Sequence, residues 1–482
     1  MVFSSVEFLL GFLPAFLLLY WITPAKAKNV VLLTGSLIFY GYGEPHYLIL
    51  LMVSILVNYF FGLHIGRGGR VQRDRRESGC GNEIDDLEEE EKTPEKRKNR
   101  FGRRRRLLFG TAVSANLLML FYFKLGFDGG TLPVGISFYT FQILSYLIDV
   151  YRRDEERENS FIRLATYITM FPQLLSGPIV TYGEVRQDLK KRSFTAVQVQ
   201  EGIKVFILGL SLKVLLADRL NFLWQEVQVT GFESISTPLA WIAAVAYSLK
   251  IYFDFYGYSL MAVGLGKMFG FSLPENFKNP YMACSVREFY RRWHMTLGRW
   301  FCKYVYIPLG GSRCGEGRTI CNLFVVWLLT SLWHGLTGNF LIWGMLLCLL
   351  IILERLLQKT VFGKIFSKKG LHWISHFYLW AVIPVTWVCF AVTDIGELQL
   401  YLERMFGLSE GIRVSKNDWL KALQSYGYLF AVGLPACTPA LKKIFNWGKD
   451  KFLGMLVLVA LLWLCIWRLQ VEGQNPFMYF QF

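Results

Sequence analysis

Residues 320–353 read ICNLFVVWLLTSLWHGLTGNFLIWGMLLCLLIIL and contain no Asp, Glu, Lys or Arg. A single α-helix of this length would extend roughly 51 Å, whereas one membrane crossing needs only about 30 Å. Gly335, Gly338 and Asn339 interrupt the stretch. We therefore predict a hairpin of two arms of about 14 residues, roughly 21 Å each, whose apex lies inside the membrane.

His334 lies at the predicted apex of this hairpin. An ionisable side chain at membrane depth is costly unless it faces a polar cavity or takes part in chemistry. One interpretation is a packed imidazole that donates a hydrogen bond to a neighbouring carbonyl. The other is a general base for a hydroxyl that attacks an activated acyl group, because an imidazole titrates near neutral pH. In that case Trp333 and Trp343 would wall the cavity, and Asn339 would orient the ring or an oxyanion.

The composition of the 482 residues supports a membrane protein beyond this hairpin. Hydrophobic residues make up 53% of the chain and charged residues only 18%, against about 25% in a soluble domain. Apolar stretches recur along the chain and the charges lie between them, which predicts one all-α polytopic membrane domain over residues 1–482. A soluble enzyme is excluded. The net charge is +16. In a membrane protein, an excess of Lys and Arg first indicates which loops lie in the cytoplasm. We therefore do not expect nucleic acid as a partner.

The distribution of charge predicts the topology. Residues 67–106 are polar and end in Arg103–Arg106, so we expect a disordered cytoplasmic loop there. Residues 161–180 are apolar but contain Pro172 and Pro178, which suggests a re-entrant segment. The other predicted spans are 8–23, 29–43, 47–65, 107–125, 133–150, 198–220, 238–260, 373–393, 421–438 and 452–467. With the hairpin they give about 12 crossings and place both chain ends outside.

A basic segment at residues 274–318 precedes the hairpin on the predicted inner face. Its core, REFYRRWHMTLGRWF at 287–301, alternates aromatic and basic residues in a way typical of a helix lying in the membrane interface. One interpretation is an anchor to anionic lipid. The other is a cradle for the phosphates of a cytosolic donor such as coenzyme A. The candidate cationic residues for the second interpretation are Arg291, Arg292, Arg299 and Lys303.

Several motifs together resemble the membrane-bound O-acyltransferase family, in its alginate O-acetyltransferase-like bacterial branch. They begin at the residue numbers given and follow one another over nearly the whole chain: MVFSSVEFLLGFLP (1), PVGISFYTFQILSYLIDVYR (133), FPQLLSGPIV (171), YFDFYGYSLMAVGLGKMFGFSLPENFKNPY (252), REFYRRWHMTLGRWF (287), YIPLGGSR (306), LWHG (332), NFLIWG (339) and NPFMYFQF (475). Each motif alone is weak evidence for the family, but the occurrence of all of them in this order is specific to it.

The resemblance implies a ring of about 11–12 transmembrane helices around a thinned centre, with an outward-facing funnel and added amphipathic and re-entrant helices. His334 matches the invariant family histidine, and His294 matches the second. The implied enzyme is an O-acyltransferase of the bacterial inner membrane with no bound cofactor or metal. Its donor would be acetyl-CoA or a similar thioester. Its acceptor would be an extracytoplasmic polysaccharide, reached directly or through a secreted SGNH-type acetyltransferase partner.

The chain departs from the family pattern near the inner mouth, where Leu260, Cys302 and Lys303 stand in place of the usual Asp, Arg and Asp. The donor could therefore differ from acetyl-CoA. One alternative is a D-alanyl transferase of teichoic acid modification, which shares the fold but lacks the YIPLGG segment. A rival of another class is a transporter, although we see no repeat between the two halves of the chain.

The last residues, 471–482, form an aromatic tail predicted to emerge outside the membrane. One interpretation is a plug at the membrane interface. The other follows from a resemblance to the small accessory protein of D-alanylation, whose terminal tyrosine is proposed to carry the acyl group. On that analogy Tyr479 would accept the acetyl group and pass it outward.

Overall fold

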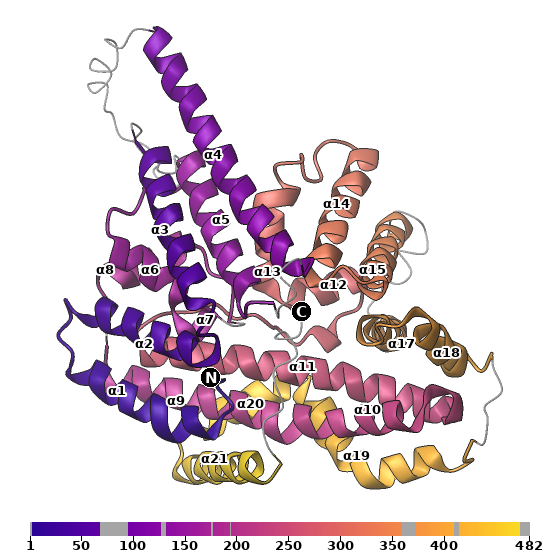
Figure 1. The fold of residues 1–482 in the computed structure, drawn as a ribbon. Coiled ribbons are helices and arrows are strands. Elements are labelled where there is room, and N and C mark those ends of the chain that lie inside the picture. The colour runs from indigo at the N-terminus through magenta and orange to yellow at the C-terminus, as the bar shows by residue number, and fades with distance from the viewer. Residues whose placement is uncertain are drawn as a thin grey trace. The chain divides into compact units, whose positions relative to one another are not determined.

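The computed structural model describes residues 2–67, 95–126, 132–174, 177–192, 194–358, 372–408 and 414–472 (Figure 1). Within these ranges the regular structure is helical and no strand occurs. The chain divides into two compact units. Unit 1 comprises Met1–Leu19, Ser176–Pro178 and Ser193–Phe482, and unit 2 comprises Tyr20–Leu175 and Ile179–Arg192. The single domain expected from the sequence stays a prediction.

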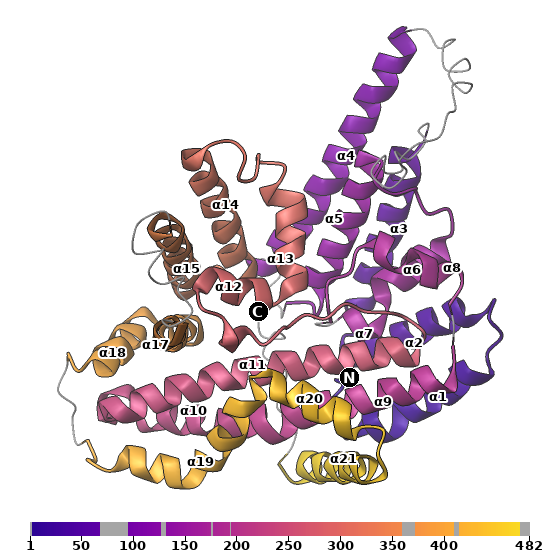
Figure 2. The ribbon, with the colours of Figure 1, turned by 180° about the vertical axis from the view of Figure 1, so that it is seen from behind.

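Unit 2 is built around three helices that lie side by side in both views of the ribbon, α3, α4 and α5 (Figures 1 and 2). Its helices are α2 (Lys28–Gly43), α3 (Leu48–Ile65), α4 (Glu95–Lys124), α5 (Ile136–Arg152), α6 (Phe161–Thr169), α7 (Phe171–Leu174) and α8 (Tyr182–Lys190). The amides of Asn58 and Asn116 hydrogen-bond to each other at 2.8 and 3.1 Å and so join α3 to α4. Such polar pairs hold helices together where hydrocarbon offers no other partner.

The expectation of a disordered loop over 67–106 is wrong for its last part, because α4 already begins at Glu95. Lys, Arg and Glu are good helix formers, so the apolar helix continues into the basic residues. This extension of α4 includes Arg105, which contacts two neighbouring helices. Its guanidinium donates to the carbonyls of Ile65 at 2.8 Å and of Val150 at 3.3 Å, which caps the ends of α3 and α5.

The segment at 161–180 contains no helix long enough to cross a membrane among its described residues. Its two helices, α6 and α7, have 9 and 4 residues, and 9 residues extend only about 14 Å. The break between them fits the prolines seen in the sequence. The re-entrant path itself stays a prediction.

Unit 1 contains α11, the longest of the described helices, with α9 packed along it (Figures 1 and 2). The order from the N-terminus is η1 (Glu7–Phe12), α1 (Leu13–Ile22, shared with unit 2), α9 (Ala196–Ser211), η2 (Leu212–Ala217), α10 (Asp218–Thr230), η3 (Phe232–Ser234), α11 (Thr237–Met268) and η4 (Pro280–Met282). Then follow α12 (Val286–Arg292), α13 (Met295–Phe301), η5 (Cys302–Tyr306), α14 (Glu316–His334), α15 (Gly338–Leu357), α17 (His372–Ala391), α18 (Ile395–Phe406), α19 (Asp418–Ala436), α20 (Pro439–Gly448) and α21 (Phe452–Glu472).

Glycines allow α9 and α11 to approach each other closely. A Cβ on Gly209 would lie 2.5 Å from the carbonyl oxygen of Gly257, and a Cβ on Gly202 would lie 2.5 Å from that of Gly264. Backbone contact of this kind is typical of helices that associate within a membrane. It fixes α11, which in turn packs against α17.

A buried ion cluster lies where α9 passes into α10. The ammonium of Lys213, in the π-helical turn η2, is 2.5 Å from Asp218 and 3.0 Å from Asp254 of α11. All three side chains are buried. Charges at this depth are tolerated only when paired, so the cluster ties the π-helical turn to α11.

The predicted hairpin is present, but its arms are longer than expected. Helix α14 has 19 residues and α15 has 20, against the predicted 14, because each helix continues past the apolar stretch into charged residues. Gly338 and Asn339 belong to the first turn of α15, so the interruption is confined to 335–337. The argument that short arms hold the apex inside the membrane is therefore wrong, although His334 does end the first arm.

Every predicted span falls in helical structure, although the span predicted over 198–220 covers α9, η2 and the start of α10, and the span predicted over 8–23 covers η1 and α1. Five of the described helices are long and apolar enough to cross a membrane by length and composition: Leu48–Ile65, Gly102–Lys124, Gly338–Leu357, Trp373–Ala391 and Phe452–Glu472. The total of about 12 crossings stays a prediction. Tyr479 and the rest of the aromatic tail after Glu472 lie outside the described residues.

The contact between α9 and α11 predicts a destabilising substitution. In Gly209→Ala the new Cβ would collide with the backbone of α11, and forcing the helices apart should cost about 1–3 kcal/mol. Thermal unfolding of the detergent-solubilised protein measures the loss. Gly427→Ala in α19 is the matched control, because no atom lies within 4 Å of its Cβ position. Equal melting temperatures for the two variants would contradict this account of the packing.

Candidate active site

His334 is enclosed by aromatic side chains at the turn of the α14–α15 hairpin. It is the last residue of α14, and the extended backbone of Gly335 ends the helix. Its imidazole is 5% exposed. The ring centroids of Trp343 and Phe390 lie 4.9 and 5.2 Å from that of His334, both edge-on. The ring is thus held among apolar faces contributed by α15 and α17.

The hairpin that carries His334 is tightly closed. A Cβ on Gly344 of α15 would collide with the side chain of Ser331 of α14. The amide of Asn339 accepts a hydrogen bond from Thr337 at 2.6 Å and donates one to the carbonyl of Phe390 at 3.0 Å. These contacts fix the turn and tie it to α17. The predicted role of Asn339 toward the histidine or an oxyanion stays a prediction.

His294 lies at a sharp break between α12 and α13. Its backbone is left-handed, with φ 45° and ψ 52°, a conformation rare for a residue with a side chain. The single interface helix predicted from REFYRRWHMTLGRWF is therefore wrong, since the segment forms two short helices. The aromatic residues of this segment, Phe289, Trp293, Trp300 and Phe301, are 8% exposed or less, because they pack within unit 1.

Asn276 holds this break in place. Its backbone carbonyl accepts from the N–H of Met295 at 2.9 Å. Its side-chain Oδ1 lies 3.2 Å from the N–H of Thr296, 3.0 Å from the Thr296 hydroxyl and 3.1 Å from His294 Nδ1. Burial lowers the pKa of the His294 imidazole to about 3, so the ring is neutral at physiological pH.

Glu354 of α15 anchors the start of α12. Its carboxylate accepts from the backbone N–H groups of Val286 at 2.6 Å and Arg287 at 3.1 Å, and from the Tyr378 hydroxyl at 3.2 Å. A carboxylate at a helix N-terminus satisfies donors that have no partner within the helix. The segment that carries His294 is thus fastened to the hairpin that carries His334.

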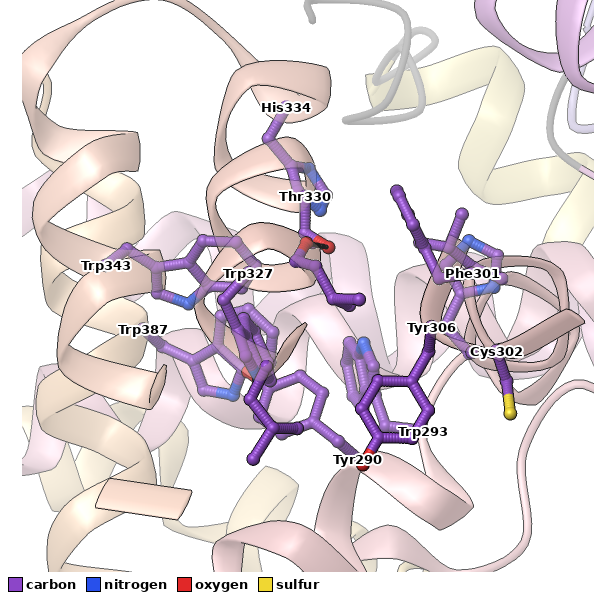
Figure 3. Close-up of a pocket in the computed structure, with 15 residues that line it drawn as sticks. Tyr290, Trp293, Phe301, Cys302, Tyr306, Trp327, Thr330, His334, Trp343 and Trp387 are labelled. Carbon is purple, nitrogen blue, oxygen red and sulfur yellow. Dashed lines mark hydrogen bonds between the residues drawn. The ribbon is translucent and has the colours of Figure 1, made fainter. Parts of the chain in front are cut away.

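The two histidines line one cavity of about 210 Å³ (Figure 3). In the close-up the His334 ring points into the space between Trp327 and Thr330 on one side and Phe301 on the other, while the sulfur of Cys302 points away from it. The lining is mostly aromatic and aliphatic. It consists of Tyr290, Trp293, His294, Leu297, Gly298, Phe301, Cys302, Tyr306, Leu323, Val326, Trp327, Thr330, His334, Trp343 and Trp387.

Trp333 lies next to both histidines without lining the cavity. Its ring centroid is 4.7 Å from that of His334 and 6.5 Å from that of His294. The indole is 8% exposed, so it packs behind the two imidazoles. Trp333 and Trp343 were both predicted as walls of the cavity, and of these two only Trp343 lines it, together with Trp327 and Trp387.

The predicted basic residues lie away from the cavity. Arg291 and Arg299 are exposed. Arg292 forms an ion pair with Glu288 at 2.5 Å, and the ammonium of Lys303 lies 5.0 Å from the ring of Tyr304. None of the four lines the cavity. Their predicted contact with donor phosphates stays a prediction.

Several cavity residues were not predicted as site residues. Trp387 comes from α17, which the sequence placed in a separate span with no link to the hairpin, and Tyr290 and Tyr306 were quoted only as parts of motifs. Asn276 stands in the PENFKNPY motif at 274–281, a signal that could have found it. Within the described residues no group of three or more His, Cys, Asp or Glu side chains is placed to hold a metal ion.

Comparison with known proteins identifies the family of this chain. The family model described as "MBOAT, membrane-bound O-acyltransferase family" matches residues 152–392, which include both histidines. A Pseudomonas putida protein named "Probable alginate O-acetylase" is 32% identical over the full length of both chains. The "Peptidoglycan O-acetyltransferase" of Helicobacter pylori is 30% identical over 85% of this chain and 80% of its own. The "Teichoic acid D-alanyltransferase" of Bacillus subtilis is 28% identical over only 44% of this chain and 56% of its own.

An all-α chain with several membrane-spanning helices thus carries two buried histidines on one apolar cavity, inside the region that the family model matches. The chain belongs to the membrane-bound O-acyltransferase family and is a multi-pass membrane O-acyltransferase.

Proposed function

We propose that the protein transfers an acetyl group from a cytosolic thioester, acetyl-CoA or a similar donor, to a hydroxyl of a polysaccharide outside the inner membrane of a bacterium. The observation that carries the proposal is the shared cavity of His294 and His334. The names of the full-length relatives, which refer to O-acetylation of alginate and of peptidoglycan, support acetyl as the group and an exported glycan as the acceptor.

His334 acts as the general base in this proposal. Its imidazole takes the proton from the acceptor hydroxyl while the hydroxyl oxygen bonds to the thioester carbonyl carbon. The tetrahedral intermediate then collapses, the carbon–sulfur bond breaks, and the proton held by the imidazole goes to the departing thiolate. The products are an ester and a thiol, and no other reactant is needed. The aromatic surroundings of His334 keep bulk water away from the acyl group.

The size and polarity of the cavity suit the acyl end of a thioester. Its volume of about 210 Å³ is below the range of about 300–1,000 Å³ typical of sites that enclose a whole drug-sized ligand. The lining residues contribute no Lys, Arg, Asp or Glu, so the cavity favours an acetyl group and the neutral arm behind it over a phosphate. The exposed cations Arg291 and Arg299 remain candidates for contacts to the phosphates.

A D-alanyl transferase is the second candidate, and the match to a teichoic acid D-alanyltransferase over part of the chain supports it. Purified protein separates the two. An acetyl transferase would release coenzyme A from acetyl-CoA, whereas a D-alanyl transferase would need a charged carrier protein. We further propose that the acetyl group reaches the glycan either directly, through Tyr479, or through a secreted SGNH-type partner.

The role of His334 predicts a large loss of activity in His334→Ala. Without the general base, the rate of coenzyme A release from acetyl-CoA should fall by about 10²–10⁴-fold. A spectrophotometric thiol assay on the purified protein measures it. His64→Ala is the matched control, because His64 lies in α3 of unit 2, where its Nδ1 is 2.8 Å from the carbonyl oxygen of Phe60. Retention of full activity in a folded His334→Ala variant would refute the mechanism.

If the acetyl group passes through Tyr479, the Tyr479→Phe variant should lose polysaccharide acetylation without losing its fold. This variant lacks the phenol oxygen that would carry the acetyl group, so acetylation of the polysaccharide in cells should stop while the protein remains folded. Mass spectrometry of the wild-type protein after incubation with acetyl-CoA should find an acetyl group on Tyr479. Tyr42→Phe, at an exposed tyrosine of α2, is the control. Normal polysaccharide acetylation in Tyr479→Phe would leave direct transfer or the secreted partner as the route.

A further inference from the structure

The cavity is open on one side and closed on the other. Lining residues that are exposed or partly exposed include Gly298, Cys302 and Tyr306 on one flank and Leu323, Val326 and Thr330 of α14 on the other. The lining residues contributed by α15 and α17, Trp343 and Trp387, are each only 2% exposed. The close-up shows these two tryptophans on the opposite side of the cavity from Phe301 and Cys302 (Figure 3). The entrance for a ligand therefore lies between η5 and α14, and the two tryptophans stand at the closed end.

Trp343 stands at the closed end directly beside His334. The centroids of the two rings are 4.9 Å apart, and the rings meet edge to face. In the proposed mechanism the thioester carbonyl carbon is brought to His334. The sulfur and the long arm behind it must then extend toward the open side, since that is where the cavity is exposed. The acyl carbons beyond the carbonyl point the other way, toward the indole of Trp343.

The indole of Trp343 is held in place by other rings and by its own helix. The ring centroids of Phe390, Trp327 and Trp387 lie 5.1, 6.1 and 6.3 Å from that of Trp343. The next residue of α15, Gly344, lies so close to α14 that a Cβ there would collide with its side chains. A close-packed interior of this kind does not expand without cost. The closed end therefore does not recede in front of a longer acyl chain.

We propose that Trp343 is a specificity-determining residue that sets the length of the transferred acyl group, admitting acetyl and rejecting butyryl. This inference rests on the proposed function, in which a coenzyme A thioester is the donor. The carbons that butyryl adds to acetyl would have to occupy the space that the indole fills. One methylene too many in an apolar pocket changes specificity by about 10–200-fold. A purely structural role of Trp343 would instead affect the reactions of both thioesters alike.

The test measures kcat/KM for coenzyme A release from acetyl-CoA and from butyryl-CoA by the purified full chain. In the wild type the value for butyryl-CoA should be about 10–200-fold below that for acetyl-CoA. In Trp343→Leu the ratio of the butyryl-CoA value to the acetyl-CoA value should rise by a similar factor, because the smaller side chain leaves room for the added carbons. Trp343→Phe, which keeps an aromatic ring, should give a smaller rise and serves as the test if Trp343→Leu does not fold.

Trp224→Leu is the matched control. Trp224 of α10 is also a buried tryptophan of unit 1, 4% exposed, with the rings of Tyr247 and Tyr401 at 4.8 and 5.5 Å. It does not line the cavity. We expect both Trp224→Leu and Trp343→Leu to lose thermal stability, because each leaves a void in a packed region. The ratio between the two thioesters should change in Trp343→Leu and stay at the wild-type value in Trp224→Leu.

A second readout does not depend on turnover. A ligand that binds only the folded protein raises its melting temperature. At equal concentration, acetyl-CoA should raise the melting temperature of the wild type more than butyryl-CoA does. In Trp343→Leu the two thioesters should have equal effects, or butyryl-CoA the larger one. Coenzyme A, which has no acyl group, should raise the melting temperatures of the two proteins by the same amount.

The outcomes separate this inference from the proposed function. An unchanged ratio in folded Trp343→Leu would overturn the inference, while release of coenzyme A by the wild type would leave the function standing. Equal use of both thioesters by the wild type would also overturn it, as would an equal rise of the ratio in Trp224→Leu. If the wild type releases coenzyme A from neither thioester and neither raises its melting temperature, the donor class is wrong and the inference fails with it.

Discussion

The structure of the site depends on one break in the chain, between α12 and α13 at His294. A buried turn must find partners for its backbone N–H and carbonyl groups. Here a neighbouring extended segment supplies them. Asn276 accepts from Met295 and Thr296, and the N–H of Lys278 donates to the carbonyl of Arg292 at 2.9 Å. These bonds offset the cost of the left-handed backbone at His294.

Because of this break, aromatic side chains of an amphipathic segment face the cavity and do not lie along one outer face of a helix. A continuous helix would spread its aromatic side chains along one face. Interrupted at His294, the segment directs Trp293, Leu297 and Phe301 toward the hairpin, where all three line the cavity. The stretch is also held from the hairpin side by Glu354. The geometry between the two histidines is therefore fixed by polar contacts that lie outside the cavity, and the cavity itself remains apolar.

The sequence predicted the parts of this arrangement that depend on local pattern. Absence of charge over 320–353, together with the interruption at Gly335, Gly338 and Asn339, was enough to predict a hairpin and to place His334 at its turn. The same pattern gave arms that were too short, because helix ends are set by capping and propensity and not by hydropathy alone. Each arm therefore continues through residues such as Glu316 and Glu354.

What the sequence could not predict depends on contacts between distant residues. The alternation of aromatic and basic residues in 287–301 favours one helix, and the residue that bonds to the break, Asn276, stands 18 positions before His294. Trp387 reaches the cavity from α17, in a helix whose own pattern says only that it is apolar. A single sequence contains no signal for such pairings, since periodicity reports the environment of an element and not its neighbours.

The separation of charge from the cavity constrains what can enter it. Basic residues are abundant on the surface of 287–303, yet the lining contains none. A ligand that is anionic at one end and neutral at the other can satisfy both environments only if the neutral end enters. For a thioester donor that end is the acyl group with its arm, the part that the proposed mechanism brings to His334. The same arrangement admits a hydroxyl and resists a charged competitor, because an unpaired charge inside an aromatic cavity would pay a large desolvation cost.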